Sequence, residues 1–165
     1  MARELPVAVA VPDADAMRDL GARLATILRR GDLVIATGDL GAGKTTLTQG
    51  LGAGLGVQGP VISPTFVLSR VHQPTGDGPW LVHVDAYRLT SFAELEDIDL
   101  EASLDDAVTL VEWGAGVAEG LAEDRLEIDI RRSIDPADET RWVFVSGVGP
   151  RWTRDDLASL TLEDA

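Results

Sequence analysis

Gly38-Asp39-Leu40-Gly41-Ala42-Gly43-Lys44-Thr45 is the most informative segment of this 165-residue chain. It fits the pattern G-x-x-x-x-G-K-[ST] without a mismatch. The apolar run Leu33–Thr37 before it is typical of a buried strand, and Lys44–Leu55 after it is expected to be a helix. In such a unit the glycines let successive backbone N–H groups turn inward, and the helix adds the positive end of its dipole. The segment therefore predicts a loop that binds the phosphates of a nucleotide.

The lysine of this loop is the only one in the chain, although 14 residues are Lys or Arg. Enrichment in Ala, Gly, Arg and Asp indicates GC-rich coding, under which Arg replaces Lys wherever either residue serves. Lys44 therefore marks a position that needs a compact ammonium group, as the β and γ phosphates of a nucleotide do. Thr45 would offer its hydroxyl to Mg²⁺.

The composition sets the class of protein. The length fits a single P-loop domain, residues 1–165, that needs no disulfides, and the chain has no Cys. The apolar run near the N-terminus is too short for a secretory signal and no stretch approaches a membrane span, so we expect a soluble, cytoplasmic protein without membrane partners. The net charge of −14 argues against direct binding to a nucleic-acid backbone.

The remaining pattern predicts an α/β fold, a P-loop NTPase-like three-layer sandwich of about seven strands, mostly parallel with some antiparallel pairing. Strands are predicted at Val7–Val11, Leu33–Thr37, Thr65–His72, Trp80–Asp85, Val108–Glu112, Leu126–Ile130 and Trp142–Ser146. Helices are predicted from a cap at Asp13 or Asp15 to a stop at Gly31, and at Lys44–Leu55, Ser91–Asp97, Gly116–Leu121 and Asp155–Leu160. The turn residues after His72 predict that Thr65–His72 and Trp80–Asp85 form a hairpin.

Two carboxylates end predicted strands, Asp85 and Glu112. Ligands of open α/β sheets gather at the carboxyl ends of strands, so either residue can hold Mg²⁺ or orient water. Ser63-Pro64-Thr65-Phe66 stands where many P-loop proteins carry a switch that senses the γ-phosphate. His72 and His83 are interpreted as ordinary strand histidines.

Four motifs in this order resemble one family: Gly38–Thr46, Ser63–Phe66, His83-Val-Asp-Ala-Tyr-Arg-Leu89 and Val111-Glu-Trp113. They are similar to the TsaE (YjeE) family, the ATPase of tRNA threonylcarbamoyladenosine biosynthesis, over roughly Asp13–Val145. The resemblance implies a seven-stranded P-loop fold that binds ATP or ADP with Mg²⁺ and hydrolyses ATP slowly. It also implies TsaB and TsaD as partners, which transfer threonylcarbamoyl to adenosine 37 of tRNA and are reset by the ATP cycle. The chain would then meet tRNA only through that complex.

The resemblance carries over residue by residue. Lys44 matches the phosphate lysine, Thr45 and Glu112 match the Mg²⁺ ligands, and Asp85 matches the aspartate needed for hydrolysis. Thr65 matches the switch threonine.

Other matches concern the nucleotide itself. Trp113 matches the tryptophan after the glutamate, and Arg141 matches a late arginine beside the base. Where the family often has a threonine near the adenine, this chain has Met17. The implied nucleotide-binding residues are Gly38, Asp39, Leu40, Gly41, Ala42, Gly43, Lys44, Thr45, Thr46, Trp113 and Arg141.

Three other functions compete with this one. A small P-loop kinase would need an Arg-rich lid, whereas Arg88–Asp106 is strongly acidic. A GTPase would need an Asn-Lys-x-Asp motif, and the chain has no Asn. A nucleotide-gated binding module, with hydrolysis only as a timer, partly merges with the family's role.

Overall fold

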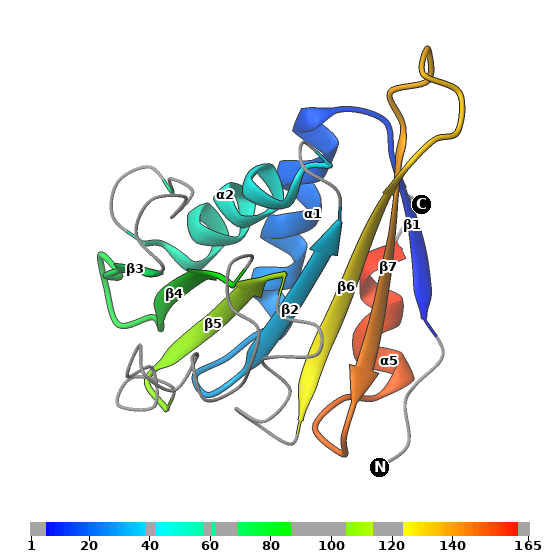
Figure 1. Ribbon diagram of the computed structural model, residues 1–165. Coiled ribbons are helices and arrows are strands. Elements are labelled where there is room, and N and C mark those ends of the chain that lie inside the picture. Colours follow the sequence, from blue (N-terminus) through cyan, green and yellow to red (C-terminus); the bar gives the residue numbers. More distant parts are fainter. Residues whose placement is uncertain are drawn as a thin grey trace.

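The computed structural model describes residues 6–38, 42–57, 61, 69–86, 105–113 and 124–161. One sheet of seven strands has the order β1-β7-β6-β2-β5-β4-β3 (Figure 1). The strands are β1 Val7–Val11, β2 Leu33–Gly38, β3 Ser69–His72, β4 Trp80–Asp85, β5 Ala107–Glu112, β6 Arg125–Arg132 and β7 Arg141–Val148. The helices are α1 Ala14–Ile27, α2 Lys44–Leu55 and α5 Arg154–Ala158, with a 3₁₀ turn η2 at Ser159–Thr161.

The sheet is mixed, with four parallel strands at its centre. β2 lies between β5 and β6 and is parallel to both, and β4 is parallel to β5. The β3–β4 and β6–β7 pairs are antiparallel, and β1 pairs antiparallel with β7. The predicted α/β class, strand number and β3–β4 hairpin are therefore confirmed. Half of the strand pairs are parallel. The other half are antiparallel, namely the β3–β4 and β6–β7 hairpins and the β1–β7 pair.

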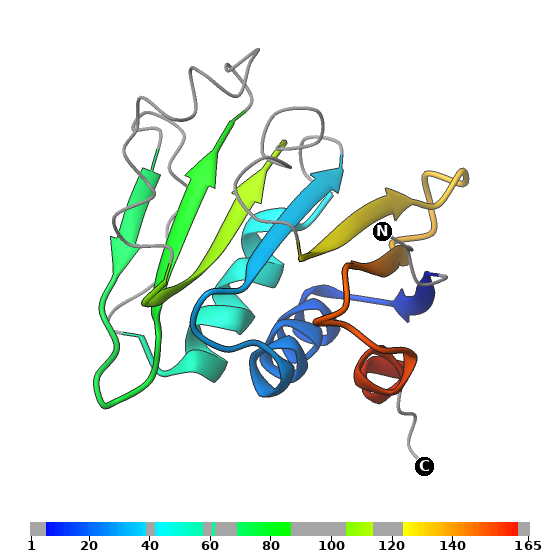
Figure 2. The same cartoon turned by 90° about the horizontal axis from the view of Figure 1, so that it is seen from below.

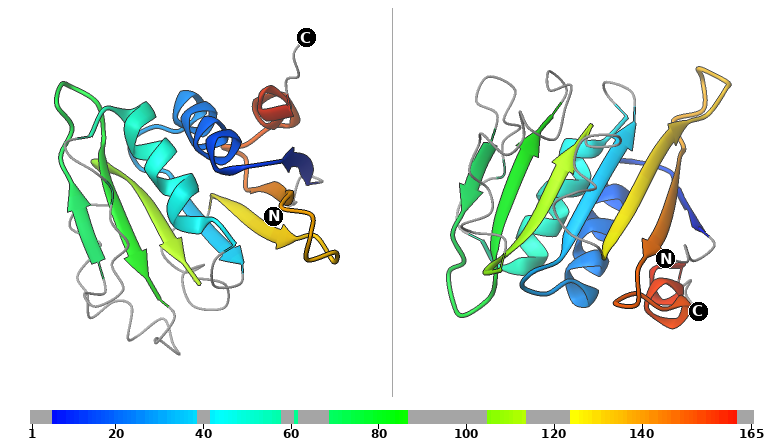
Figure 3. Two further views of the ribbon diagram at one scale, coloured as in Figure 1. Left: turned by 90° about the horizontal axis from the view of Figure 1, so that it is seen from above. Right: turned by 60° about the horizontal axis from the view of Figure 1, so that its bottom comes forward.

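All three described helices lie on the same face of the sheet (Figures 2 and 3). Alternate strand residues such as Val34 and Ala36 join Leu47 and Leu51 of α2 in one hydrophobic cluster. The stretches predicted as helices at Ser91–Asp97 and Gly116–Leu121, which would complete a third layer, lie outside the described residues. No described helix has the length and apolar character needed to cross a bilayer.

The two long helices touch through glycines. A Cβ atom on Gly50 would lie 2.1 Å from the backbone oxygen of Arg18, and one on Gly21 would lie 2.3 Å from that of Leu47. A Cβ atom would collide with backbone at either position, so the two helix backbones are in direct contact here. This contact places the first turn of α2 beside the first half of α1.

The ends of α1 differ in how well the sequence predicts them. Asp13 caps the helix by accepting a hydrogen bond from the backbone N of Ala16 at 2.8 Å, as one of the two predicted caps. The predicted stop at Gly31 is wrong, because the helix ends at Ile27. The backbone N of Arg29 donates to the carboxylate of Asp32 at 2.8 Å instead of continuing the helical ladder.

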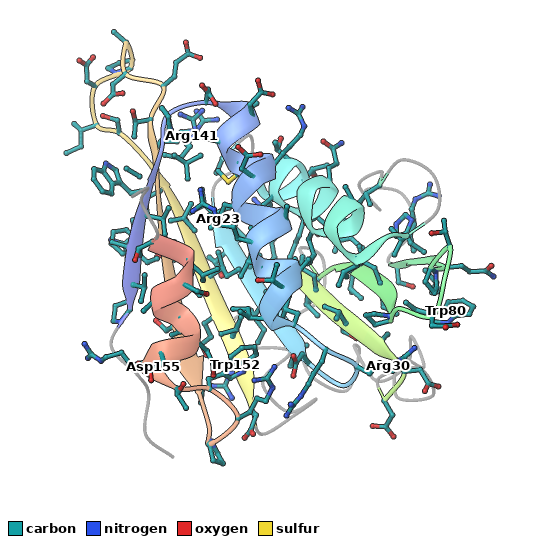
Figure 4. All side chains as sticks on the ribbon, turned by 180° about the vertical axis from the view of Figure 1, so that it is seen from behind. Arg23, Arg30, Trp80, Arg141, Trp152 and Asp155 are labelled. Carbon is teal, nitrogen blue, oxygen red and sulfur yellow. The ribbon has the colours of Figure 1, made fainter. Side chains whose placement is uncertain are left out.

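A largely buried ion pair joins two segments that lie far apart in the sequence. The guanidinium of Arg151 donates to both carboxylate oxygens of Asp32, at 3.1 and 3.0 Å, and to the backbone oxygen of Ile27 at 2.8 Å. The same guanidinium stacks 3.9 Å from the ring centre of Trp152, which lies beside α5 (Figure 4). These contacts tie the segment before α5 to the turn between α1 and β2.

The last helix also differs slightly from its prediction. A capping box between Thr153 and Asp156 starts α5 at Arg154, and the predicted end at Leu160 falls within the 3₁₀ turn. Arg23 of α1 donates to the backbone oxygen of Leu160 at 2.8 Å, which fastens this turn to α1 (Figure 4).

Candidate functional site

The carboxyl ends of the parallel strands meet at one edge of the sheet. Glu112 of β5 pairs in register with Ala36 of β2 on one side and with Asp85 of β4 on the other. The backbone N of Trp113 donates to the oxygen of Ala36 at 2.9 Å, so the pairing of β5 with β2 continues one residue further. Both predicted strand-end carboxylates thus lie at the edge where β2 enters the glycine-rich loop.

The loop ends at the first residue of α2. Gly43 takes a left-handed conformation, with φ of 116°, and makes no side-chain capping bond to the helix. A helix start without a side-chain cap keeps backbone N–H groups for a bound anion. Three residues assigned to the loop from sequence, Asp39, Leu40 and Gly41, lie outside the described residues.

Met17 packs against this loop from α1. Its side chain is buried, and its Cε atom would lie 3.0 Å from a Cβ atom placed on Gly43. The residue that departs from the family's threonine is therefore a packing contact beneath the loop, and it brings the first turn of α1 next to the site.

Lys44 lies between the ends of β2 and β5. Its Nζ donates to the backbone oxygen of Gly38 at 2.5 Å and sits 4.4 Å from the centre of the Trp113 ring. The residue is only 5 % exposed, and both the carbonyl dipole of Gly38 and the aromatic face of Trp113 stabilise its charge. The loop lysine and the residue after Glu112 are therefore in direct contact.

Trp113 has an unusual backbone. Its φ of 63° is the only positive value among the non-glycine residues that the structure describes. Such a conformation costs about 1–3 kcal/mol in a non-glycine residue and is found where the surrounding structure enforces it. Here the sharp turn directly after Glu112 places the indole ring over the ammonium group of Lys44.

Glu112 is buried and hydrogen-bonded to a histidine. Its Oε2 lies 2.5 Å from Nε2 of His83, with side-chain exposures of 6 % and 0 %. His83 lies in β4 as predicted, and its interpretation as an ordinary strand histidine did not include this contact with Glu112. Sequence reasoning missed it because His83 and Glu112 are 29 residues apart, and only the β4–β5 pairing joins them. The available signal was its position two residues before Asp85, on the same face of β4.

The other predicted site residues lie on α2, β4 and β7. Thr45 and Thr46 are half-buried in the first turn of α2, and Asp85 is half-buried at the end of β4. Arg141 starts β7 opposite Arg132 of β6, at the same edge of the sheet and near the start of α1 (Figure 4). Thr65 lies outside the described residues.

The oxygen atoms at this edge suit a magnesium ion. The Thr45 hydroxyl and the Glu112 and Asp85 carboxylates are the hard oxygen ligands that Mg²⁺ prefers. Within the described ranges, Oε1 of Glu112 accepts no hydrogen bond, whereas Oε2 accepts one from His83. No group of three His, Cys, Asp or Glu side chains that could hold a metal occurs there. Mg²⁺ bound together with a nucleotide needs only one or two carboxylates, because phosphates and water supply the rest.

A separate hollow lies on the sheet face opposite α1 and α2. It has a volume of about 510 Å³ and is lined by residues of β2, β6 and β7, among them Ile35, Glu127 and Phe144. Neither Lys44 nor Glu112 lines it, so this hollow is distinct from the group of residues around the glycine-rich loop.

Comparisons with known proteins agree with one another. The family profile of threonylcarbamoyl adenosine biosynthesis protein TsaE matches residues 11–141. The tRNA threonylcarbamoyladenosine biosynthesis protein TsaE of Streptomyces coelicolor is 60 % identical over 87 % of this chain and 99 % of its own length. The protein of the same name from Bacillus subtilis is 38 % identical over 78 % of this chain and 77 % of its own. The crystal structure of YdiB from Bacillus subtilis superposes with a TM-score of 0.74, at 28 % identity, over 97 % of this chain and 96 % of that one. On its fold, its motifs and these matches, the chain belongs to the TsaE family of tRNA threonylcarbamoyladenosine biosynthesis proteins.

Proposed function

We propose that this protein binds ATP with Mg²⁺ at the edge formed by Gly38, Lys44 and Glu112, and hydrolyses it slowly. The observation that carries the proposal is the position of Lys44, which is buried at the start of α2 in contact with the ends of both β2 and β5. A buried ammonium group beside uncapped helix N–H groups is suited to the β and γ phosphates of a nucleotide.

Each residue of the group would then have one task. The loop from Gly38 to Gly43 would surround the phosphates with backbone N–H groups, and Lys44 would leave the Gly38 oxygen to contact them. Thr45 and Glu112 would hold Mg²⁺, which supplies charge neutralisation on the phosphates when it is bound. Asp85 would orient the attacking water.

The nucleotide base would extend toward the other half of the sheet. Arg141 lies at the correct edge for this, because β7 runs antiparallel to β6 and begins where β6 ends. Met17 packs beneath the loop on the same side. Thr65 would sense the γ-phosphate, and Thr46 would contact phosphate from the first turn of α2.

The proposed role of hydrolysis is to reset a TsaB–TsaD complex between rounds of threonylcarbamoyl transfer to adenosine 37 of tRNA. The net charge of −14 supports indirect contact with tRNA, because a chain this acidic repels a phosphate backbone. In the proposed complex, TsaB and TsaD would hold the tRNA. Such work belongs in the cytoplasm.

The sharpest test separates the two strand-end carboxylates. Glu112→Ala should weaken Mg²⁺-dependent ATP binding as well as hydrolysis, because it removes a metal ligand. Asp85→Ala should keep most of the ATP affinity but lose turnover, because P-loop catalysis depends mainly on the position of groups around the phosphate. The assays are a Mg²⁺ titration of ATP binding and ATP hydrolysis with and without TsaB and TsaD.

Two outcomes would contradict these assignments. If Asp85→Ala loses metal-dependent binding while Glu112→Ala keeps it, the two roles are reversed. If neither substitution changes turnover, neither carboxylate faces the nucleotide. Thr109→Val is a matched control on β5, since Thr109 is buried three residues before Glu112 and its side chain points to the other face of the sheet.

A further inference from the structure

We infer that His83 is a positioning residue, which holds the carboxylate of Glu112 in the orientation that binds Mg²⁺. This inference rests on the proposed function, because it assigns Glu112 to the metal. Both polar residues of the motif His83-Val84-Asp85 would then have a role. His83 would orient Glu112, and Asp85, at the end of β4, would orient the attacking water.

The geometry leaves His83 one polar partner in the described structure. The side chain is fully buried, and its Nε2 lies 2.5 Å from Oε2 of Glu112. The other ring nitrogen, Nδ1, is buried and has no hydrogen-bond partner among the described residues. A proton on Nδ1 would therefore be buried without an acceptor, so the ring proton belongs on Nε2, where it is donated to the carboxylate.

This hydrogen bond restricts how Glu112 can act. A glutamate side chain has three rotatable bonds, and a metal site needs one of its oxygens at a defined place. Anchoring Oε2 to a ring that is itself fixed in the sheet leaves Oε1 as the oxygen for the metal. Hydrogen-bonded partners of metal ligands commonly change metal affinity by about 10- to 100-fold when they are removed.

A purely structural role for His83 is the alternative. A buried histidine can simply satisfy a buried carboxylate that would otherwise be costly, with no effect on metal binding. The two roles differ in their consequence for Mg²⁺, because a structural defect weakens nucleotide binding with or without metal. The positioning role weakens only the part of the affinity that Mg²⁺ supplies.

The test uses the purified full-length chain, with ADP as the nucleotide and Mg²⁺ or EDTA in the buffer. The readout is the Mg²⁺ concentration that gives half of the metal-dependent gain in ADP affinity. For His83→Asn, whose amide is too short to reach Glu112, this concentration should rise about 10- to 100-fold. ADP affinity in EDTA should stay within about twofold. His83→Gln places an N–H donor near the position of Nε2 and should keep the wild-type Mg²⁺ response within about threefold.

His72→Gln is the matched control. This second histidine lies on the neighbouring strand β3, is partly buried, and makes no hydrogen bond to Glu112. It should leave the Mg²⁺ response unchanged. Equal losses for His83→Asn in Mg²⁺ and in EDTA, or no loss in either, would overturn the positioning role.

A second measurement needs no change at His83. The chain has two histidines, so ¹⁵N-histidine labelling with His72→Gln as a reference isolates the His83 ring signals. We expect the tautomer protonated at Nε2, and a shift of the Nε2 signal when Mg²⁺ is added to the ADP complex but not when EDTA is added. A proton on Nδ1, or no response to Mg²⁺, would overturn the inference even if every variant failed to fold.

The wild-type protein in the same series reports on the proposed function separately. If wild-type ADP binding shows no dependence on Mg²⁺, the assignment of Glu112 and Thr45 to the metal fails, and the inference on His83 fails with it. If wild type depends on Mg²⁺ and His83→Asn does so equally, only the inference on His83 is wrong.

Discussion

Replacing Lys44 with Ala should reduce nucleotide affinity strongly while leaving the fold almost as stable. In the proposed complex the ammonium group makes charge-assisted hydrogen bonds to phosphate, worth on the order of 2–3 kcal/mol, which corresponds to about 30- to 150-fold in the dissociation constant. Before a nucleotide binds, the ammonium group of Lys44 contacts the backbone oxygen of Gly38 and the ring of Trp113. Losing a cation–π contact costs about 0.5–2 kcal/mol, and removing a buried charge offsets part of that.

Calorimetric titration with ATP and Mg²⁺ measures the affinity, and urea unfolding measures the stability. Lys44→Met is the matched variant, because it keeps most of the apolar stem and loses the charge. Lys44→Arg keeps the charge but replaces a compact ammonium with a wide planar fork, so it should also bind weakly. If Lys44→Ala and Lys44→Met bind ATP within about threefold of wild type while remaining folded, the loop does not hold the phosphates and the reasoning fails.

Three further predictions concern selectivity and stability. ATP or ADP should bind at least about tenfold more tightly than GTP, a difference of ~1.4 kcal/mol, since the chain has no Asn-Lys-x-Asp motif; equal affinities in a competition titration would contradict this. Arg151→Met should lower the free energy of unfolding by about 3–5 kcal/mol, because it leaves Asp32 buried without its cation; a loss below ~1 kcal/mol in urea unfolding would refute that. Burial, and then repulsion from His83 and Arg70, lowers the pKa of His72 below 6.5 in the folded protein. The unfolded chain therefore binds a proton at His72 more readily, and the free energy of unfolding should fall as the pH drops below 6.5. His72→Gln should reduce this acid-induced loss between pH 7.5 and 5.5, and an unchanged loss would count against the assignment.

Elements with strong local signals were predictable to the residue. The helix Lys44–Leu55 and the strand Trp80–Asp85 have the predicted bounds, because a glycine-rich turn precedes each of them. The last two strands are longer than predicted, extending to Arg125–Arg132 and Arg141–Val148. Four of the six added residues are arginines, and all six are paired across the β6–β7 hairpin, so backbone pairing rather than apolar periodicity keeps them in the sheet.

The end of α1 shows why local signals mislead elsewhere. Gly31 does adopt a left-handed conformation, with φ of 92°, as a helix-terminating glycine would. The helix has already ended at Ile27, because Asp32 binds the backbone N of Arg29 and is itself held by Arg151, 119 residues away. A contact across the whole chain therefore decides where a helix ends, and no local window contains it.

The same limit applies to the site, and it explains which residue was missed. Lys44, Thr45, Asp85 and Glu112 could be named from motifs, because each follows a strand or starts a helix. Their neighbours could not, since adjacency depends on β5 lying between β2 and β4. Once that order is known, the pairing of Asp85 with Glu112 places His83, two residues back on the same face, within reach of the Glu112 side chain.

This arrangement also explains why the backbone and the side-chain carboxylate of Glu112 are held by different contacts. The backbone oxygen of Glu112 accepts from the N of Ala86, and the next residue, Trp113, turns sharply into a left-handed conformation to reach Lys44. The strand therefore holds the backbone of Glu112 but cannot hold its flexible side chain at the point where regular pairing stops. The imidazole N–H of His83, on the neighbouring strand β4, supplies that restraint. Since the donor ring is neutral in this tautomer, it adds no negative charge beside the Glu112 carboxylate. On this view, the glycine-rich loop alone would bind phosphates, and the His83–Glu112 pair makes that binding depend on Mg²⁺.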